Sequence, residues 1–432
     1  MKKLERAIST AIRLISILAL VIWSVGCASV SLRQGREYLD REKYPEALES
    51  LTRALSEDPD NPEIHRDLGI AHYGLGEFDK ALEELGIAKQ ELTKDGELMF
   101  YLGLTYENLE EYDKAIEEYS NYVQVARFRG IRRKIQRRIG QLNQKWARQW
   151  AKERMELEAD IGSVSVQDDV IAVTDFKPFG MSEELEPLRI GLTQLLITDL
   201  KLVKGLKVVE RLMVKELYRE MGVSSAEFVD QSTAPKLGKL LGAGTLIIGT
   251  FTGVGDRSWR IHPTLGLIKT GDLKELESVG GEFAELLQAE KDLIFEVLAE
   301  LDIGLTDDIR DNIMRNIPTE SLEAFISYSR GLDYLDKGMY SEAEEEFKAA
   351  ISEDSGFGQA RDHLLETQSL SQPMDSVDIL EEAWDSELSA HETVNESLAT
   401  TVNEVSQSDA ENELIPEVAT PEPREVLLRI SW

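Results

Sequence analysis

The stretch GREYLDREKYPEALESLTRALSEDPDNP (residues 35–62) recurs in outline twice further along the chain, each time after 34 residues. The recurring positions are mostly small or apolar, and they are Gly35, Gly69 and Gly103; Ala47, Ala81 and Ala115; Leu51, Leu85 and Tyr119; and Ala54, Ala88 and Tyr122. Glycine and alanine let two helix backbones approach closely where the helices cross, and larger side chains fill the space between neighbouring units. The period therefore predicts stacked helix–turn–helix units.

This 34-residue pattern resembles the tetratricopeptide repeat, and we predict three such repeats over residues 27–126, with Pro59 closing the first. The resemblance implies a concave inner face that binds a peptide or helix of an envelope protein. Its lining would be Arg36, Asp40, Arg66, Tyr73, Glu107 and Asn108. Two alternatives stay open: the repeats only space the next domain from a membrane, or they serve homo-oligomerisation.

The first residues have the features of a signal peptide (residues 1–26). Four cations precede an apolar run over residues 14–25, which is too short to span a bilayer, since that takes about 20 residues. The run leads into Ser24-Val25-Gly26-Cys27, which resembles a bacterial lipobox and implies acylation of Cys27, with palmitate among the acyl chains. Several chains would make a stable anchor. Ala28 resembles an outer-membrane sorting signal; the alternatives are an incidental cysteine after a plain leader, and a host with a single membrane.

The composition disfavours several classes of function. The 432 residues include 81 acids and 48 bases, a net charge of -33, which opposes binding of nucleic acid. One cysteine excludes an intrachain disulfide and a zinc site built on several thiolates. The five histidines show no metal-binding spacing. We therefore expect no metal, no cofactor and no enzyme activity.

A basic amphipathic helix is predicted over residues 127–160. Between Arg127 and Arg154 there are 11 basic residues and one acid, Glu153, while apolar side chains recur at steps of three and four. One interpretation is a helix that caps the third repeat with its apolar stripe. The other is contact with anionic lipid headgroups, as suits a protein tethered to a membrane.

Strand-like and helix-like segments alternate over residues 168–303, which predicts a mixed α/β layer fold. VIAVTDF (170–176) and TLIIGTFTG (245–253) are typical of buried strands, and residues 187–203 and 283–301 of helices. Residues 207–222 are expected to form a short strand that turns into a helix, and residues 232–244 a helix that ends at glycine. Residues 258–271 are expected to form two strands, broken at Pro263 and Gly266.

The order of motifs here resembles the CsgG-like family of curli assembly and transport lipoproteins. Related domains occur in lipoproteins that activate penicillin-binding proteins and at the amino terminus of TolB. The residues that carry the likeness are Ala172, Val173, Asp175, Phe176, Val208, Val209, Glu210, Arg211, Leu237, Gly238, Leu241, Gly242, Ala243, Gly249 and Trp259. Curli-type channels add two long transmembrane hairpins, but the segment between Gly255 and Glu282 is short and charged, so we do not infer a pore.

No catalytic constellation stands out. Gly242 and Gly244 precede a strand, whereas a phosphate loop follows a strand and opens a helix. Asp175, Glu210 and Arg211 could line a cleft, although a structural Glu–Arg pair is the simpler interpretation.

The repeat pattern returns over residues 320–366, where Gly331 and Ala343 take the same relative places as in the first repeats. One repeat cannot bury its apolar face alone, so we expect it to dock on the α/β domain or on a neighbour. Residues 372–432 hold 15 acids and 2 arginines and are predicted to be a disordered acidic tail.

The predicted architecture is thus an α-helical solenoid, a mixed α/β domain, a further helical repeat and an acidic tail. The leading hypothesis is an outer-membrane lipoprotein on the periplasmic face of the cell envelope, which acts as a scaffold in envelope assembly or secretion. The alternatives are a regulator that activates a cell-wall synthase and a ring-forming secretion component.

Overall fold

The computed structural model describes residues 30–126, 129–223, 233–254, 258–373, 380 and 383–384. The described residues from 30 to 373 belong to one compact unit. The predicted signal peptide, the lipidation site Cys27 and nearly all of the predicted acidic tail lie outside the described residues.

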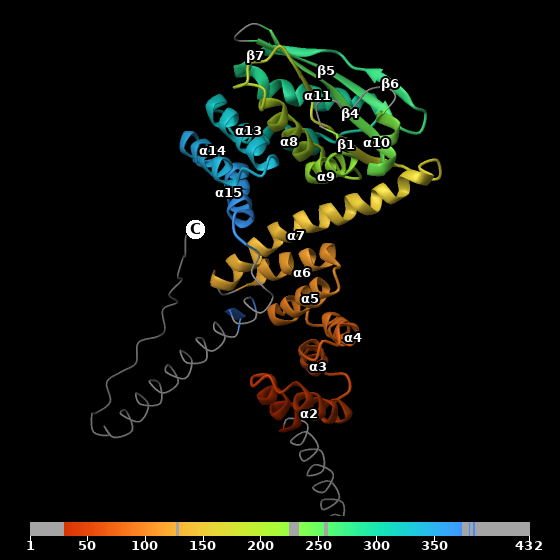
Figure 1. The fold of residues 1–432 in the computed structure, drawn as a ribbon, viewed down its shortest axis with the longest axis vertical. Coiled ribbons are helices and arrows are strands. Elements are labelled where there is room, and N and C mark those ends of the chain that lie inside the picture. Colours follow the sequence, from red (N-terminus) through yellow and green to blue (C-terminus); the bar gives the residue numbers. More distant parts are fainter. Residues whose placement is uncertain are drawn as a thin grey trace, which may run out of the picture. The chain divides into compact units, whose positions relative to one another are not determined.

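The amino-terminal part consists of paired helices (Figure 1). Residues 30–39 pair with α2 (Tyr44–Glu57), α3 (Pro62–Gly74) with α4 (Phe78–Lys89), and α5 (Gly96–Asn108) with α6 (Tyr112–Val125). The glycines of the period lie where the two helices of a pair cross. A Cβ atom at Gly35 would come within 2.6 Å of Leu51, and one at Gly69 within 2.5 Å of Leu85. The 34-residue period is therefore the period of these crossings.

A single long helix, α7 (Arg129–Glu156), follows the repeats. Its apolar stripe is fully buried at Ile131, Ile135, Leu142, Ala147 and Ala151. The helix packs against α6, and also against helices of the α/β domain and the C-terminal repeat (Figure 1). The stripe thus caps the repeats and also joins them to the rest of this compact unit.

The α/β domain is built on one mixed sheet. Its strands are β1 (Gln167–Val173), β2 (Lys177–Phe179), β3 (Lys207–Val208), β4 (Ala243–Val254), β5 (Ser258–Leu267), β6 (Asp272–Glu275) and β7 (Val279–Glu282). The order is β3-β1-β4-β5-β6, with β2 beside β4 and β7 beside β5. Strands β1, β2, β3 and β4 pair in parallel, and the pairs made by β5 are antiparallel.

Helices cover both faces of the sheet. Ile171 and Val173 of β1 point into a core shared with α8 (Leu188–Leu200) and α11 (Leu286–Glu300). Ala172, between them, points into a second core with α9 (Arg211–Met221), α10 (Ala234–Leu241) and Ala151 of α7. Alternate side chains of a strand face opposite sides. The chain after β1 therefore leads to α8 on one face of the sheet, whereas the chain after β3 leads to α9 on the opposite face.

The expected break at Pro263 is wrong, because β5 runs without interruption from Ser258 to Leu267. On its outer side β5 pairs with β7 up to Ile261 and with β6 from Thr264. Pro263 lies where the outer partner changes, and its carbonyl accepts a hydrogen bond from the amide of Leu276. A residue in an antiparallel strand directs its N–H and C=O to the same side. The N–H that proline lacks is therefore not needed for pairing with β4.

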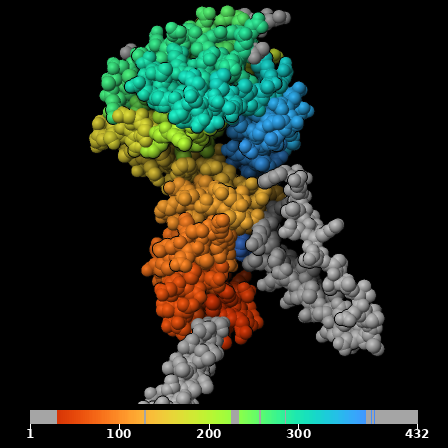
Figure 2. All heavy atoms as spheres, turned by 180° about the vertical axis from the view of Figure 1, so that it is seen from behind, coloured from red at the N-terminus to blue at the C-terminus, as the bar shows by residue number. Residues whose placement is uncertain are grey.

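The C-terminal repeat follows the short helix α12 (Asp307–Arg315) and comprises α13 (Leu322–Asp336), α14 (Tyr340–Glu353) and α15 (Gly358–Leu370). Helix α13 packs on α8, and α15 packs on α7. Figure 2 shows its blue atoms directly against those of the α/β domain. The repeat thus docks on the α/β domain of its own chain. Within the described part of the chain, no helix combines the length and apolar character needed to cross a bilayer.

Candidate functional site

A ladder of ion pairs connects the first helices of successive repeats, on the face that the sequence predicts to be the inner one. Arg36 binds Asp67 at 2.6 Å and Glu63 at 2.7 Å, each time on the next repeat. Arg66 binds Asp67 at 2.7 Å, Asp95 at 2.7 Å and Glu97 at 3.3 Å. The structure therefore brings the two predicted arginines together through Asp67, a buried residue that the sequence alone did not single out.

Carboxylates outnumber guanidinium groups in this ladder. Burial disfavours the charged form of Arg66, but Glu97, Asp67 and Asp95 outweigh it and raise the pKa of Arg66. Burial also raises the pKa of Glu97 to about 7, with Arg66 opposing the shift and Asp67 and Asp95 adding to it. The ladder therefore has carboxylate charge in excess of its own cations.

The other predicted inner-face residues fall into two groups. Asp40 and Asn108 are exposed, and the Asn108 side chain donates a hydrogen bond to the hydroxyl of the half-buried Tyr73 at 3.5 Å. Glu107 is buried, with 7% of its surface exposed. Its carboxylate pairs with Arg138 of α7 and accepts a hydrogen bond from Tyr119 at 3.2 Å. Glu107 therefore fastens α7 to the third repeat and does not line an open face.

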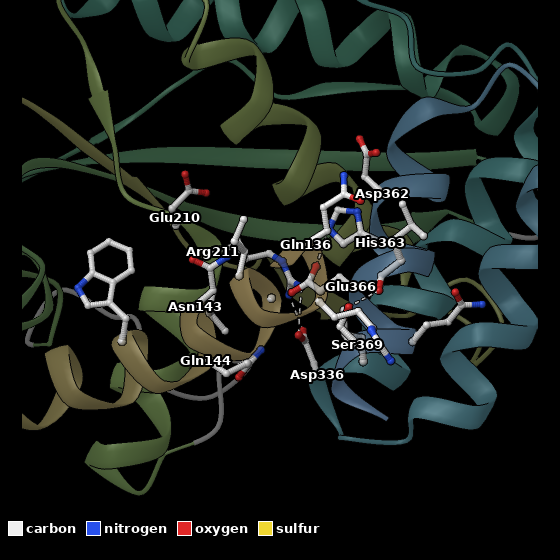
Figure 3. A pocket seen from close by; sticks show the side chains of 18 of the residues that line it. Gln136, Asn143, Gln144, Glu210, Arg211, Asp336, Asp362, His363, Glu366 and Ser369 are labelled. Carbon is white, nitrogen blue, oxygen red and sulfur yellow. Dashed lines mark hydrogen bonds and ion pairs between the residues drawn. The ribbon is translucent and has the colours of Figure 1, made fainter. Parts of the chain in front are cut away.

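A cavity of 910 Å³ lies where α7, α9, α13 and α15 meet (Figure 3). Its wall is a mixture of apolar, amide and charged side chains, among them Trp146 of α7 and Leu365 of α15. Leu365 has 57% of its surface exposed, which is high for a large apolar residue. We call this space the junction cavity, because α7, the α/β domain and the C-terminal repeat all contribute to its wall.

The Glu–Arg pair expected at the end of β3 is not formed. Glu210 pairs instead with Lys201, and Arg211 forms two hydrogen bonds to the carboxylate of Asp336 at the end of α13. Lys215 reaches the same carboxylate at 3.2 Å. Figure 3 shows Arg211 and Asp336 directed toward each other in the junction cavity. Arg211 therefore connects the α/β domain with the C-terminal repeat.

The pKa values follow from this contact. Burial disfavours the charged form of Arg211, but Asp336 outweighs it and raises the pKa of Arg211. Burial would raise the pKa of Asp336, but Arg211 and Lys215 lower it. Both groups are thus held in their charged forms.

Asp175 lies just after β1, close to this contact but facing another arginine. Its carboxylate is 3.3 Å from the guanidinium of Arg189 on α8. The Nε atoms of both Arg189 and Arg211 are buried without a hydrogen-bond acceptor among the described residues. Two arginines with unused donors therefore lie near the carboxyl ends of β1 and β3.

In the described ranges, no three His, Cys, Asp or Glu side chains are grouped so that they could hold a metal ion.

Comparison with known families identifies the parts of the chain. Residues 35–76 match the model described as TPR repeat, and residues 97–127 the model described as tetratricopeptide repeat. Residues 151–258 match the model described as curli production assembly/transport component CsgG. The chain carries tetratricopeptide repeats and a CsgG-like domain. The CsgG match begins in α7 and ends at the first residue of β5, although the sheet of the CsgG-like domain continues to β7.

Solved structures that resemble the chain include the following three, each with a low TM-score. The Sgt2 TPR domain from Aspergillus fumigatus is 26% identical, with 23% of this chain and 65% of that chain covered and a TM-score of 0.22. MamA is 27% identical, with 27% of this chain and 66% of that chain covered and a TM-score of 0.25. A tetratricopeptide repeat protein from Parabacteroides merdae is 14% identical, with 79% and 99% covered and a TM-score of 0.26. The chain thus spans slightly less than two thirds of the first two. No curated protein matches the sequence significantly.

Proposed function

We propose that this protein is a lipid-anchored scaffold of the bacterial cell envelope, facing the periplasm, where it acts in assembly or secretion. The tetratricopeptide repeats would recruit a partner protein and hold it in a fixed position relative to the CsgG-like domain. The CsgG family description, which refers to curli assembly and transport, supports an envelope role.

The observation that carries the proposal is the continuity of α7. This helix has 28 residues, which at about 1.5 Å per residue corresponds to roughly 40 Å. Its buried stripe is in contact with α6 of the repeats and with α9 of the CsgG-like domain. A partner bound by the repeats would therefore keep a constant distance from the CsgG-like domain, as a scaffold requires.

The inner face of the repeats is the proposed partner site, formed by Arg36, Asp40, Arg66, Tyr73 and Asn108. Four carboxylates of the ion-pair ladder face only two guanidinium groups. We therefore expect the partner segment to contribute basic side chains. Glu107 is not part of this site, because it is buried against α7.

The proposed membrane attachment rests on Cys27. A contribution from anionic lipid would have to come from the exposed cations of α7, since the apolar stripe of that helix is buried against protein. The attachment would keep the scaffold at the surface where envelope components assemble.

Site-specific photo-cross-linking in cells tests the proposal. A photoreactive residue at Asp40 or Asn108 should capture a specific envelope protein, whereas the same residue at the exposed Glu49 or Lys80, on the second helix of a repeat, should not. Equal capture from all four positions would contradict a partner site on the inner face. Capture of a penicillin-binding protein from Asp40 or Asn108 would point to regulation of a cell-wall synthase instead.

A further inference from the structure

The junction cavity lies at a place where open α/β sheets bind ligands. Such sheets bind them outside the carboxyl ends of parallel strands, where the connections of two neighbouring strands leave toward opposite faces. Strands β1 and β3 are parallel neighbours with this property, because β1 leads to α8 and β3 leads to α9. Arg211, in the cavity wall, is the first residue of α9.

The inner end of the cavity already holds a carboxylate. Arg211 and Lys215 both bind Asp336, which the C-terminal repeat inserts from α13. The Nε atom of Arg211 is still without an acceptor among the described residues. A buried donor without a partner is uncommon in a native protein and calls for an explanation such as a bound ion or water. Arg211 therefore has one donor that Asp336 does not occupy.

The wall formed by α7 adds more cations. Arg133 and Lys134 line the cavity, and neither forms an ion pair within the residues that the structure describes. Arg137 lines it too and donates a hydrogen bond to the side chain of Gln372. In a chain with a net charge of -33, two neighbouring cations without an ion pair among the described residues, Arg133 and Lys134, stand out on one wall of a cavity.

Four acids also line the cavity, and they do not cancel this surplus. Asp336 forms ion pairs with Arg211 and Lys215, and Glu210 forms an ion pair with Lys201. Asp362 and Glu366 lie on the opposite wall, on α15, where Glu366 is 4.0 Å from His363. The cationic side of the cavity is thus the α7 wall together with Arg211.

We propose that the junction cavity is a binding site for an anionic ligand that carries a phosphate or carboxylate group. The anionic group would lie between Arg211 and the cations Arg133 and Lys134 of α7. The carboxylate of Asp336, which belongs to the chain itself, already pairs with Arg211 and Lys215 at the inner end of the cavity. Because the cavity walls come from α7, the CsgG-like domain and the C-terminal repeat, the ligand would stabilise the arrangement of these parts.

Calorimetric titration of the full chain with inorganic phosphate, at constant ionic strength set with NaCl, tests the site. We expect saturable binding that weakens at least fivefold in the double variant Arg133→Gln, Lys134→Gln. The matched control is Arg132→Gln, Lys152→Gln, which removes two exposed α7 cations outside the cavity and should change the affinity less than twofold. Equal weakening in both double variants, or no saturable binding of any probe, would overturn the proposal.

Sedimentation with vesicles of phosphatidylglycerol and phosphatidylcholine distinguishes the source of the anionic group. If only the cavity variant loses vesicle binding, the group is a lipid headgroup; if only phosphate titration separates the variants, it is a soluble anion. The variant Asp336→Asn gives an independent check, because removal of the internal carboxylate should make phosphate bind severalfold more tightly. Unchanged or weaker binding in a folded Asp336→Asn chain would contradict the role of Asp336.

Discussion

Gly191 of α8 lies directly against Ser329 of α13, so that a Cβ atom at Gly191 would overlap the Ser329 hydroxyl and come within 2.9 Å of the Phe325 ring. This crossing joins the CsgG-like domain to the C-terminal repeat. Around it, Phe325, Tyr328 and Leu332 are buried in the same core as the α8 side chains. The absence of a side chain at one position therefore allows two domains to share a core.

Substitution Gly191→Val should destabilise the chain by about 1–3 kcal/mol, the usual cost of forcing extra atoms into a packed core. Urea denaturation gives the free energy of unfolding. The control is Gly86→Ala in α4, where a Cβ atom meets nothing within 4 Å. That change should be neutral or stabilise by about 0.5–1 kcal/mol, because alanine is the better helix former. A Gly191→Val chain as stable as the wild type would show that α8 and α13 are not tightly packed.

Substitution Arg138→Met should cost about 3–5 kcal/mol, because it leaves the carboxylate of Glu107 buried without its cation. The double variant Arg138→Met, Glu107→Gln should recover part of this loss, since no buried charge remains. The matched surface pair is Arg41 with Glu37, more than half exposed on both sides, and Arg41→Met should cost less than about 1 kcal/mol. Similar losses for Arg138 and Arg41 would contradict the role of the buried pair in fastening α7.

Glu290 makes stability depend on pH. It is buried beside Asp199 and Lys291, and burial, reinforced by Asp199 and opposed by Lys291, raises its pKa to about 8 from the ordinary 4.5. The folded chain therefore holds this proton more tightly than the unfolded chain. The stability it contributes is complete below pH 4.5 and is lost as the pH rises to about 8. Burial also raises the pKa of Asp199, although Lys291 and Asn316 oppose this shift. Asp199 therefore changes stability with pH in the same direction as Glu290.

Substitution Glu290→Gln should accordingly flatten the fall in melting temperature between pH 5 and pH 8, because glutamine has no proton to lose. Calorimetric scans across this range measure the slope. Glu220→Gln, at an exposed position of α9, is the control and should leave the slope as it is. A wild-type melting temperature that does not fall toward pH 8 would rule out this account of Glu290.

Substitution Cys27→Ala should move the protein from the membrane fraction to the soluble fraction, because the acylated thiol is the proposed anchor. Fractionation of cells followed by immunoblotting detects the change. Ala28→Ser, which keeps Cys27, should leave the protein in the membrane fraction. Continued membrane association of the Cys27→Ala chain would mean that another part of the protein holds it there.

The sequence by itself determined the repeats and most elements of the CsgG-like domain. Gly35, Gly69 and Gly103 recur because close helix crossings recur, and such crossings are local in sequence. Apolar runs such as residues 245–253 give a buried strand for the same local reason. These features depend on the spacing of residue types within a few dozen positions, which can be read directly.

Only the tertiary structure decided which distant residues meet. Asp336 binds Arg211, which is 125 residues away, and Glu107 is withdrawn from the inner face by Arg138. Pro263 fits within β5 because two different strands meet its outer edge. Each of these outcomes depends on where a second element packs. An isolated charge or proline has the same local preferences wherever its partner lies, so its position in the sequence carries no sign of which contact it will make.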